Sequence, residues 1–258
     1  MSAPILQVRE LTRKFGGLTA VNSVDLDVYP NEVVGLIGPN GAGKTTAFNC
    51  IAGSTTPTSG RITFLGQDCT GFPAHRMARL GLTRTFQITS IFPAMSTIDN
   101  VRAATYRVTR QGWVPAIFRT GAWRRQEEEI DAKARDILKF VHLDHRADFN
   151  AEALSYGEHR RLEIAIALAA EPKLLLLDEP AAGMNPEEGQ RLVNMIHDIK
   201  RRGIAVLIVE HHMRVVMGVC DRVVVIDHGT KIAEGPPAEV ANNPDVIRVY
   251  LGREQVSA

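Results

Sequence analysis

The sequence has few of the features on which extracellular and membrane-embedded proteins depend. Its three cysteines are scattered along 258 residues without a C-x-x-C pair: Cys50, Cys69 and Cys220. Such a set is typical of buried thiols in a reducing compartment and does not indicate a disulfide framework. The longest apolar runs, Ile164 to Ala170 and Leu174 to Leu177, are far shorter than the ~18 residues that span a bilayer. Because Met1 to Pro4 also begin no signal peptide, we expect a chain that is cytosolic when isolated.

The sequence also lacks an excess of either positive or negative charge. The chain has 30 lysines and arginines against 29 aspartates and glutamates, so its net charge of +1 does not indicate a general affinity for nucleic acid. The hydrophobic share of 45% and the charged share of 23% are ordinary for a globular protein. The length allows one large α/β domain with a subdomain.

The order of apolar patterns predicts a mainly parallel sheet with helices on both faces. Residues 5 to 30 alternate apolar and polar side chains, as half-exposed antiparallel strands do. From Leu154 onward, helical patterns alternate with continuous apolar runs such as Leu174 to Asp178. Residues 97 to 141 predict inserted helices, with interruptions at Gly112, Pro115 and Gly121. Further helices are expected at Glu158 to Ala170, Pro186 to Arg202 and Asn242 to Gly252, and strands at Gly60 to Leu65, Ile204 to Glu210 and Arg222 to Asp227.

Residues 38 to 46 carry the most informative motif, the glycine-rich loop Gly38-Pro39-Asn40-Gly41-Ala42-Gly43-Lys44-Thr45-Thr46. It fits the pattern G-x-x-x-x-G-K-[ST] and lies between a predicted strand, Val33 to Ile37, and a predicted helix, Thr45 to Ala52. Glycines let the backbone wrap around phosphate oxygens, and the loop amides and helix start direct positive charge at them. Lys44 adds a full charge near the β- and γ-phosphates, and Thr45 offers a hydroxyl to Mg²⁺. The loop therefore predicts a site for a nucleoside triphosphate.

Two carboxylates, Asp178 and Glu179, end the apolar strand Leu174 to Leu177. Ligands of P-loop enzymes bind at the carboxyl ends of parallel strands. Asp178 is therefore a candidate for the Mg²⁺ shell, and Glu179 for the base that polarises the attacking water. Solvated acids at a strand end would explain the pair equally well if it stood alone, but a P-loop ~130 residues earlier favours catalysis.

Three further groups have both a structural and a functional interpretation. Ser155 and Glu158 form a capping-box pattern, yet Ser155 and Gly157 at a helix start also form a second anion-binding nest. His211 and its neighbour at 212 follow an apolar strand; a metal pair lacks companions at ligand spacing, whereas a histidine there can contact a γ-phosphate. Gln87 is either a surface glutamine or a side chain that reaches Mg²⁺ or the attacking water. The segment Asn185-Pro186-Glu187-Glu188 has the same ambiguity as these groups, being a good N-cap with Pro at the first helical position.

Taken in order, these motifs resemble the ATP-binding subunit of an ABC transporter over essentially the whole chain. The resemblance assigns an aromatic loop at Phe15, Walker A at 38–46, a Q-loop at Gln87, the signature at 154–158, Walker B at 174–179, a D-loop at 182–185 and the switch histidine at His211. It implies an α/β fold of the P-loop NTPase (RecA-like) type, with a mainly parallel sheet core, an antiparallel β subdomain and an inserted helical subdomain. The implied boundaries are 1–87 and 159–240 for the nucleotide-binding core, 88–158 for the helical subdomain and 241–258 for a C-terminal helix or tail.

The resemblance also implies a site shared by two ATPase subunits, which form a homo- or heterodimer and close head to tail on ATP and Mg²⁺. Catalytic roles fall to Glu179, His211 and Gln87, and Mg²⁺ ligation to Thr45, Gln87 and Asp178. The implied nucleotide contacts, with Phe15 stacked on adenine, are Phe15, Gly38, Pro39, Asn40, Gly41, Ala42, Gly43, Lys44, Thr45, Thr46, Ser155, Gly157 and Glu158.

Segments 154–165, 179–186 and 243–248 resemble, more narrowly, the ATPases of branched-chain amino-acid importers. This branch implies two integral membrane permease subunits, an indirect periplasmic solute-binding protein, no nucleic acid, and a peripheral place at the cytoplasmic face of the inner membrane. The alternatives are a lipopolysaccharide-export ATPase and a soluble ABC ATPase outside transport, which usually has a coiled-coil insertion or two fused cassettes. Tyr156, Glu158 and Asn185 depart from the common superfamily motifs but suit the importer branch, whereas His212 stands where that branch usually has Asp.

The stretch between Asp99 and Glu127 is basic and aromatic. It has no acidic residue and contains Arg102, Arg107, Arg110, Trp113, Phe118, Arg119, Trp123, Arg124 and Arg125. One interpretation is a helical subdomain with core aromatics and a solvated basic face; the other is contact with the membrane subunits or with anionic lipid head groups. Single-stranded nucleic acid is not favoured, because the total charge is near neutral.

Overall fold

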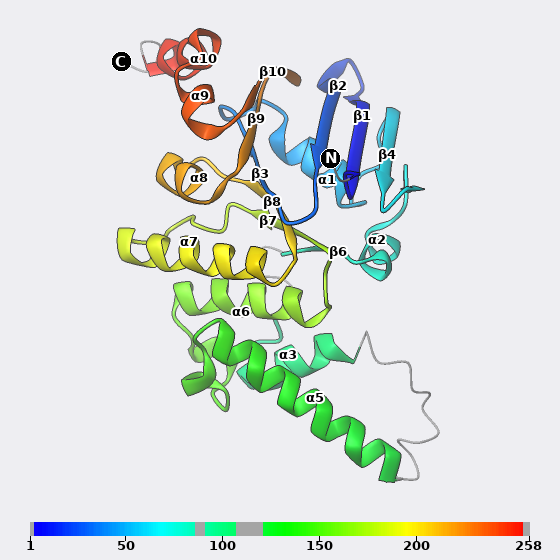
Figure 1. Cartoon of the computed structure of the whole chain (residues 1–258), viewed down its shortest axis with the longest axis vertical. Coiled ribbons are helices and arrows are strands. Elements are labelled where there is room, and N and C mark those ends of the chain that lie inside the picture. The colour runs from blue at the N-terminus through cyan, green and yellow to red at the C-terminus, as the bar shows by residue number, and fades with distance from the viewer. Residues whose placement is uncertain (1–2, 86–90, 107–120, 255–258) are drawn as a thin grey trace. The chain divides into compact units, whose positions relative to one another are not determined.

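The computed structural model describes residues 3–85, 91–106 and 121–254, and for residues 122 and 251–254 only the backbone (Figure 1). The chain divides into two compact units. Unit 1 combines Met1–Arg84 with Lys173–Ala258, and unit 2 is Thr85–Pro172. The split therefore falls beyond the expected boundary at residue 158, because the helix α6 (Tyr156–Ala169) packs against the helices of unit 2.

A six-stranded sheet in unit 1 has the order β10-β9-β3-β8-β7-β6. All neighbours in it run parallel except β10 with β9. Every residue of its three central strands is buried, which explains their continuous apolar sequences. The strands are β3 (Val33–Ile37), β6 (Leu82–Arg84), β7 (Leu174–Asp178), β8 (Ala205–Val209), β9 (Arg222–Asp227) and β10 (Thr230–Gly235).

A second, antiparallel sheet of unit 1 has the order β2-β1-β4-β5. Its strands are β1 (Leu6–Phe15), β2 (Leu18–Val28), β4 (Ser59–Phe64) and β5 (Gln67–Asp68). One hydrophobic core joins this sheet, the helix α1 (Lys44–Ile51) and the six-stranded sheet, with Phe48, Phe64 and Leu36 fully buried. This core holds the loop before α1 between the two sheets of the unit.

The remaining helices of unit 1 are α2 (Ala74–Leu80), α7 (Pro186–Arg201), α8 (Met213–Val219), α9 (Pro237–Ala241) and α10 (Pro244–Glu254). The predicted N-cap of α7 is present: the Asn185 side chain accepts from the backbone N–H groups of Glu187 and Glu188. The helix ends before Gly203, whose φ is +84°, as a C-terminal glycine allows.

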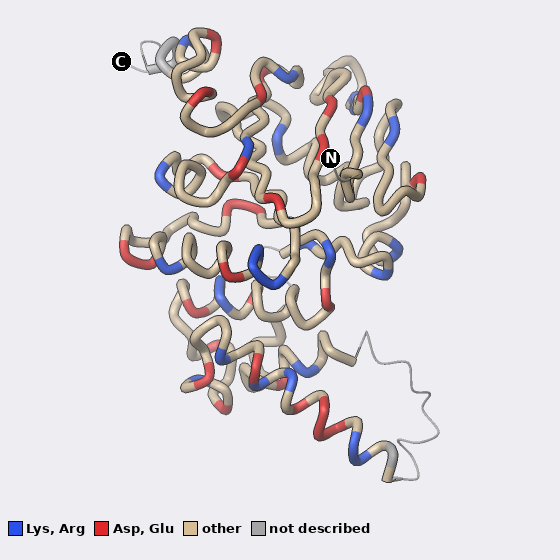
Figure 2. The backbone as a smooth tube through the Cα atoms, viewed as in Figure 1, with Lys and Arg blue, Asp and Glu red and all other residues tan. Residues whose placement is uncertain are grey.

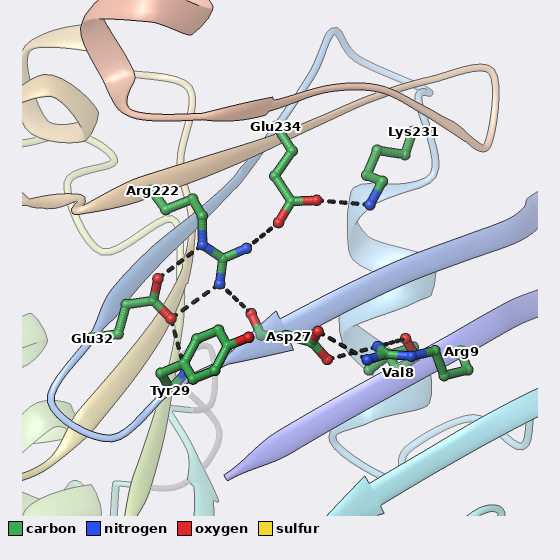
Figure 3. A network of polar contacts seen from close by, with 8 residues as sticks. All are labelled: Val8, Arg9, Asp27, Tyr29, Glu32, Arg222, Lys231 and Glu234. Atoms are coloured by element: carbon green, nitrogen blue, oxygen red, sulfur yellow. Dashed lines mark hydrogen bonds and ion pairs between the residues drawn. The ribbon is translucent and has the colours of Figure 1, made fainter. Parts of the chain in front are cut away.

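A polar cluster ties β9 to the start of the six-stranded sheet and to β2 (Figure 3). The Arg222 guanidinium donates to both carboxylate oxygens of Glu32, to Glu234 and to the Asp27 carbonyl. Glu32 also accepts from the backbone N–H of Tyr29 at 2.8 Å. The cluster thus joins the start of β9 to the residue before β3, 190 positions earlier in the chain.

Unit 2 is helical. It contains α3 (Thr97–Thr105), α5 (Gly121–Phe140) and α6, joined by two short 3₁₀ turns, Asp144–Arg146 and Ala151–Ala153. The inward face of α5 is apolar and buried at Ile130, Ala134 and Leu138, while acidic and basic residues alternate along the rest of the helix (Figure 2). The predicted interruptions at Gly112 and Pro115 lie outside the described residues. Among the described helices, none is long and apolar enough to cross a membrane.

Candidate functional site

The glycine-rich loop borders an open pocket of about 530 Å³ in unit 1. Its lining comes from the end of β1, the start of β2, the loop and first turn of α1, the residue after β7 and the turn after β9: Phe15, Leu18, Thr19, Ala20, Asn40, Gly41, Ala42, Gly43, Lys44, Thr45, Thr46, Glu179 and His228. The structure thus brings together the aromatic, the phosphate-binding loop and the carboxylate that the sequence singled out separately.

Two glycines of the loop are required by close backbone packing. A Cβ at Gly43 would lie 2.2 Å from the Ala20 carbonyl oxygen, and one at Gly38 would lie 2.1 Å from the Ile226 carbonyl oxygen. Gly41 has open space around it, and only its φ of +79° favours glycine. The loop curvature is therefore fixed by its neighbours in both sheets.

The first turn of α1 has the features that suit an anion. Its N-cap, Gly43, has left-handed backbone angles and forms no side-chain cap, and the turn contains no acidic residue. The Lys44 ammonium is buried and donates to the carbonyl oxygens of Gly38 and Pro39 at 2.8 and 3.0 Å. A helix start without a side-chain cap, beside a buried cation, suits a polyphosphate.

An exposed aromatic ring stands at the other side of the pocket lining. Phe15, the last residue of β1, is 47% exposed. The Arg13 guanidinium lies 4.5 Å from its ring centroid and donates to the Thr56 carbonyl. A flat ring with a free face can stack on a nucleotide base, which fits the role expected for Phe15.

Asp178 is buried and does not line the pocket. Its Oδ2 accepts from the Arg84 guanidinium at 2.7 Å, and Arg84 also donates to Asn49 of α1 at 2.6 Å. Sequence reasoning missed Arg84, because nothing in the pattern places β6 next to β7. The oxygen donors Thr45 and Asp178 have the hard chemistry that Mg²⁺ prefers, so the residues present fit this ion. Gln87 lies outside the described residues.

Glu179 has an unusual backbone for its residue type, with φ at +44°. Its backbone N–H donates to the Val209 carbonyl at 2.9 Å, and its side chain borders the pocket. One carboxylate oxygen lies 3.8 Å from Nδ1 of His211. The candidate base and the candidate switch histidine are therefore neighbours at the carboxyl ends of β7 and β8.

The sequence shows no companion at ligand spacing for a metal pair of His211 and His212, but the structure places Glu210 beside them. Ligand atoms of the three residues lie within 4.8 Å of one another. Glu210 is fully buried, and both of its carboxylate oxygens accept N–H groups of the chain. Such a saturated carboxylate fits a hydrogen-bonding role better than ligation of a metal.

The signature segment lies in unit 2, where its capping box is formed. The Ser155 hydroxyl accepts from the backbone N–H of Glu158 at 3.4 Å, and Glu158 accepts from the backbone N–H of Ser155 at 2.8 Å. Burial of the Glu158 carboxyl raises its pKa, but hydrogen bonds from Ser155 and Arg146 outweigh this, so the pKa lies below its usual value. Through these hydrogen bonds, the Glu158 carboxylate stabilises the start of α6.

His228 is a polar residue of the pocket that sequence reasoning missed. His228 occupies the turn between β9 and β10 with φ at +45°. The next residue, Gly229, donates from its backbone N–H to the Ala42 carbonyl at 2.9 Å, so this turn is fixed against the phosphate-binding loop. Strand Arg222–Asp227 was predicted but its partner β10 was not, although a glycine between two short runs is a hairpin signal.

Two family models match the sequence. Residues 21–182 match the ABC transporter model, and residues 230–256 match the branched-chain amino acid ATP-binding cassette transporter model. Among curated proteins, the chain is 44% identical over 253 residues to the high-affinity branched-chain amino acid transport ATP-binding protein LivG of Escherichia coli K12, with 98% of this chain and 99% of the relative covered. It is 45% identical over 253 residues to the BraF protein of the same description from Pseudomonas aeruginosa, with the same coverage.

Solved structures agree with these relatives. The crystal structure of the ADP conformation of MJ1267, an ATP-binding cassette of an ABC transporter, has a TM-score of 0.85 and 32% identity, covering 97% of this chain and 100% of that one. A nucleotide-free ATP-binding cassette from an ABC transporter has a TM-score of 0.83 and 31% identity, covering 96% and 99%.

Proposed function

The chain belongs to the ABC transporter family of ATP-binding proteins, and from this premise we propose that it is the ATP-hydrolysing subunit of an importer for branched-chain or similar amino acids. The observation that carries the proposal is the pocket in which Phe15, the glycine-rich loop and Glu179 meet. The relatives named LivG and BraF, matched over nearly their full length, support the choice of an importer over an exporter or a soluble ATPase.

Binding of ATP would use the whole length of the pocket. Phe15 would stack on the adenine, backbone N–H groups of the loop and the first turn of α1 would donate to the phosphates, and Lys44 would supply positive charge. Lys44 would exchange its carbonyl partners for phosphate oxygens, which needs little movement because its ammonium already lies inside the loop. Thr45, Asp178 and Gln87 would hold Mg²⁺, which neutralises charge on the phosphates when bound.

Hydrolysis would depend on Glu179 and His211. Glu179 is placed to accept a proton from water attacking the γ-phosphate, because its carboxylate borders the pocket beside the loop. His211, 3.8 Å from that carboxylate, would donate to the γ-phosphate and keep the base oriented. Neither residue needs to form a covalent intermediate.

A second copy, or a related ATPase, would complete the site. Ser155 and Gly157 at the start of α6 would meet the γ-phosphate of the ATP bound to the other subunit, and Glu158 would act by holding Ser155 in place. ATP would then favour the closed pair, because it contacts both surfaces only in that state. Hydrolysis removes the bridging phosphate and reopens the pair.

The wider assembly follows from the same relatives. We expect two permease subunits in the inner membrane, a periplasmic binding protein that reaches the ATPase only through them, and a peripheral place at the cytoplasmic face. The solute never contacts the ATPase, so its side chains do not select it.

Reconstitution tests the proposal directly. The chain would be purified with its permease subunits in proteoliposomes, and ATP-driven uptake of labelled leucine would be compared between the wild type and Lys44→Ala. We expect uptake and ATP hydrolysis to be lost together in the variant. ATP hydrolysis that continues without Lys44, or transport that continues without hydrolysis, would contradict the proposal.

A further inference from the structure

Glu210 is a buried acid that neither the motifs nor the proposed chemistry uses. It follows β8 directly, and its side chain is fully buried in unit 1. A buried carboxylate is retained only where hydrogen bonds replace its lost hydration. The partners of Glu210 therefore indicate what it holds.

The two oxygens of the Glu210 carboxylate face two different segments of the chain. Oε1 accepts from the backbone N–H of Ala181 at 2.9 Å, two residues beyond Glu179. Oε2 accepts from the backbone N–H groups of His211 and His212 at 2.7 and 2.9 Å. One rigid side chain thus connects the segment of the candidate base with the segment of the switch histidine.

The segment that receives Oε1 carries backbone strain. Glu179 has a φ of +44°, a conformation that residues other than glycine adopt at a cost and keep only where their surroundings impose it. Three hydrogen bonds hold it here: the Glu179 N–H donates to the Val209 carbonyl, the Ala181 N–H donates to Glu210, and the Ala182 N–H donates to the Glu179 carbonyl. If the second bond were lost, the turn after β7 could relax and move the Glu179 carboxylate.

We propose that Glu210 is a positioning residue for ATP hydrolysis, which sets the base Glu179 and the switch residue His211 in one fixed arrangement. The inference rests on the proposed function, because it concerns the same reaction. It assigns Glu210 no contact with the nucleotide. Its effect is on the turnover of bound ATP, since the residues that bind the nucleotide belong to other segments of the pocket.

His212 adds a contact that is secondary in this arrangement. Its Nδ1 lies 3.2 Å from Oε2 of Glu210, and its ring centroid lies 4.2 Å from that of His211. The backbone bonds to Glu210 do not depend on the ring. Replacing the His212 side chain should therefore leave the link between the two segments intact.

The test compares steady-state ATP hydrolysis by the full chain, assembled with its permease subunits, in the wild type and in Glu210→Gln. The amide keeps the shape but replaces one acceptor with a donor, so one of the two segments loses its bond. Because displacement of a catalytic group by about 1 Å can cost ~100-fold, we expect kcat to fall between about 10- and 100-fold while KM for ATP stays within about two-fold. The side chain of Glu210→Asp is shorter and cannot reach both segments, so this variant should also show a lower kcat with a nearly unchanged KM. It replaces the glutamine variant in the test if that variant does not fold.

Two controls separate positioning from a general loss of stability. Glu32→Gln removes another carboxylate that accepts a backbone N–H in unit 1, away from the pocket, and should lower the Tm without changing kcat. His212→Ala should change kcat by less than about three-fold, since it leaves the backbone bonds in place.

Three results would overturn the inference. The first is a folded Glu210→Gln variant whose kcat equals that of the wild type. The second is a loss of kcat in Glu32→Gln equal to the loss in Glu210→Gln. The third is a loss of kcat in His212→Ala as large as that in Glu210→Gln. Failure of the proposed function looks different, because the wild-type assembly itself would then show no ATP hydrolysis.

Discussion

Two helices of this protein begin at sequences suited to phosphate, and their first turns differ. Helix α1 starts at Gly43 with no side-chain cap, whereas α6 starts at Ser155 with a complete capping box. The first turn of α1 therefore has no side-chain cap, whereas in α6 the backbone N–H groups of Ser155 and Glu158 are bonded within the capping box. Under the proposed function this difference fits a first phosphate site at α1 and a second one at α6 that acts on the nucleotide of another subunit.

Removal of the base should have the largest effect and leave both helix starts unchanged. Glu179→Gln keeps the side-chain shape but cannot accept the proton, so kcat should fall by about 10²- to 10⁴-fold. Binding of ATP, measured by quenching of a fluorescent analogue, should stay close to that of the wild type. A variant that turns over ATP at the normal rate would show that another group is the base.

Closing the open helix start should reduce nucleotide affinity. In Gly43→Ala the new methyl group would meet the Ala20 carbonyl, and the φ of +98° is strained for alanine. We expect a loss of about 2 kcal/mol or more, or ~30-fold in the Kd for ATP measured by calorimetry. The control is Gly41→Ala, with open space around it, which should lose less affinity. Equal losses in the two variants would contradict the packing explanation.

Opening the closed helix start should separate capping from catalysis. Ser155→Ala removes the cap of α6, and Asn185→Ala removes the matching cap of α7. Each should cost about 1 kcal/mol of stability in chemical denaturation. ATP hydrolysis should fall by about ten-fold or more only in Ser155→Ala, which loses a hydrogen bond to the transition state. If both variants lose stability and neither loses ATP hydrolysis, Ser155 acts only as a helix cap.

The exposed arginines at the start of α5 should have a weaker effect. Arg124 and Arg125 are exposed, whereas Arg102 is already paired with Asp99 and Glu127, so among the described arginines of this stretch the first two are accessible to a partner. Reversing both to Glu should weaken co-purification with the permease subunits, more so at low salt, while ATP binding survives. Unchanged co-purification would contradict a role in assembly.

The smallest effect expected concerns pH. The pKa of Glu158 is lowered in the folded protein, so its hydrogen bonds stabilise α6 above the unfolded pKa and are lost as pH falls through the folded value. The Tm difference between the wild type and Glu158→Gln should therefore be full near neutral pH and shrink on acidification below about 4.5. A constant difference across this range would show that the charge of Glu158 is unimportant.

The sequence predicted those strands and helix caps that depend on residues close together in the chain. The strands Leu174–Asp178 and Arg222–Asp227 have the predicted bounds, and the predicted capping box at Ser155 and N-cap at Asn185 are both formed. The strand β6 and the helix α8 were missed, because elements of 3 and 7 residues leave no readable period.

Contacts between distant segments could not be predicted. Arg84 donates to Asp178 from 94 positions away, and Glu210 reaches Ala181 across 29. His228 enters the pocket through a hairpin whose second strand was not recognised. In the first two cases the sequence motifs gave one member of the contact, and the fold alone gave the residue that holds it.

Sedimentation velocity of the Glu179→Gln chain with ATP and Mg²⁺ tests most directly whether two chains share each nucleotide. We expect a dimer that holds two ATP molecules, and a monomer that still binds ATP when Ser155→Ala is added. A Glu179→Gln chain that remains monomeric while saturated with ATP would contradict a site built from the open helix of one copy and the closed helix of another.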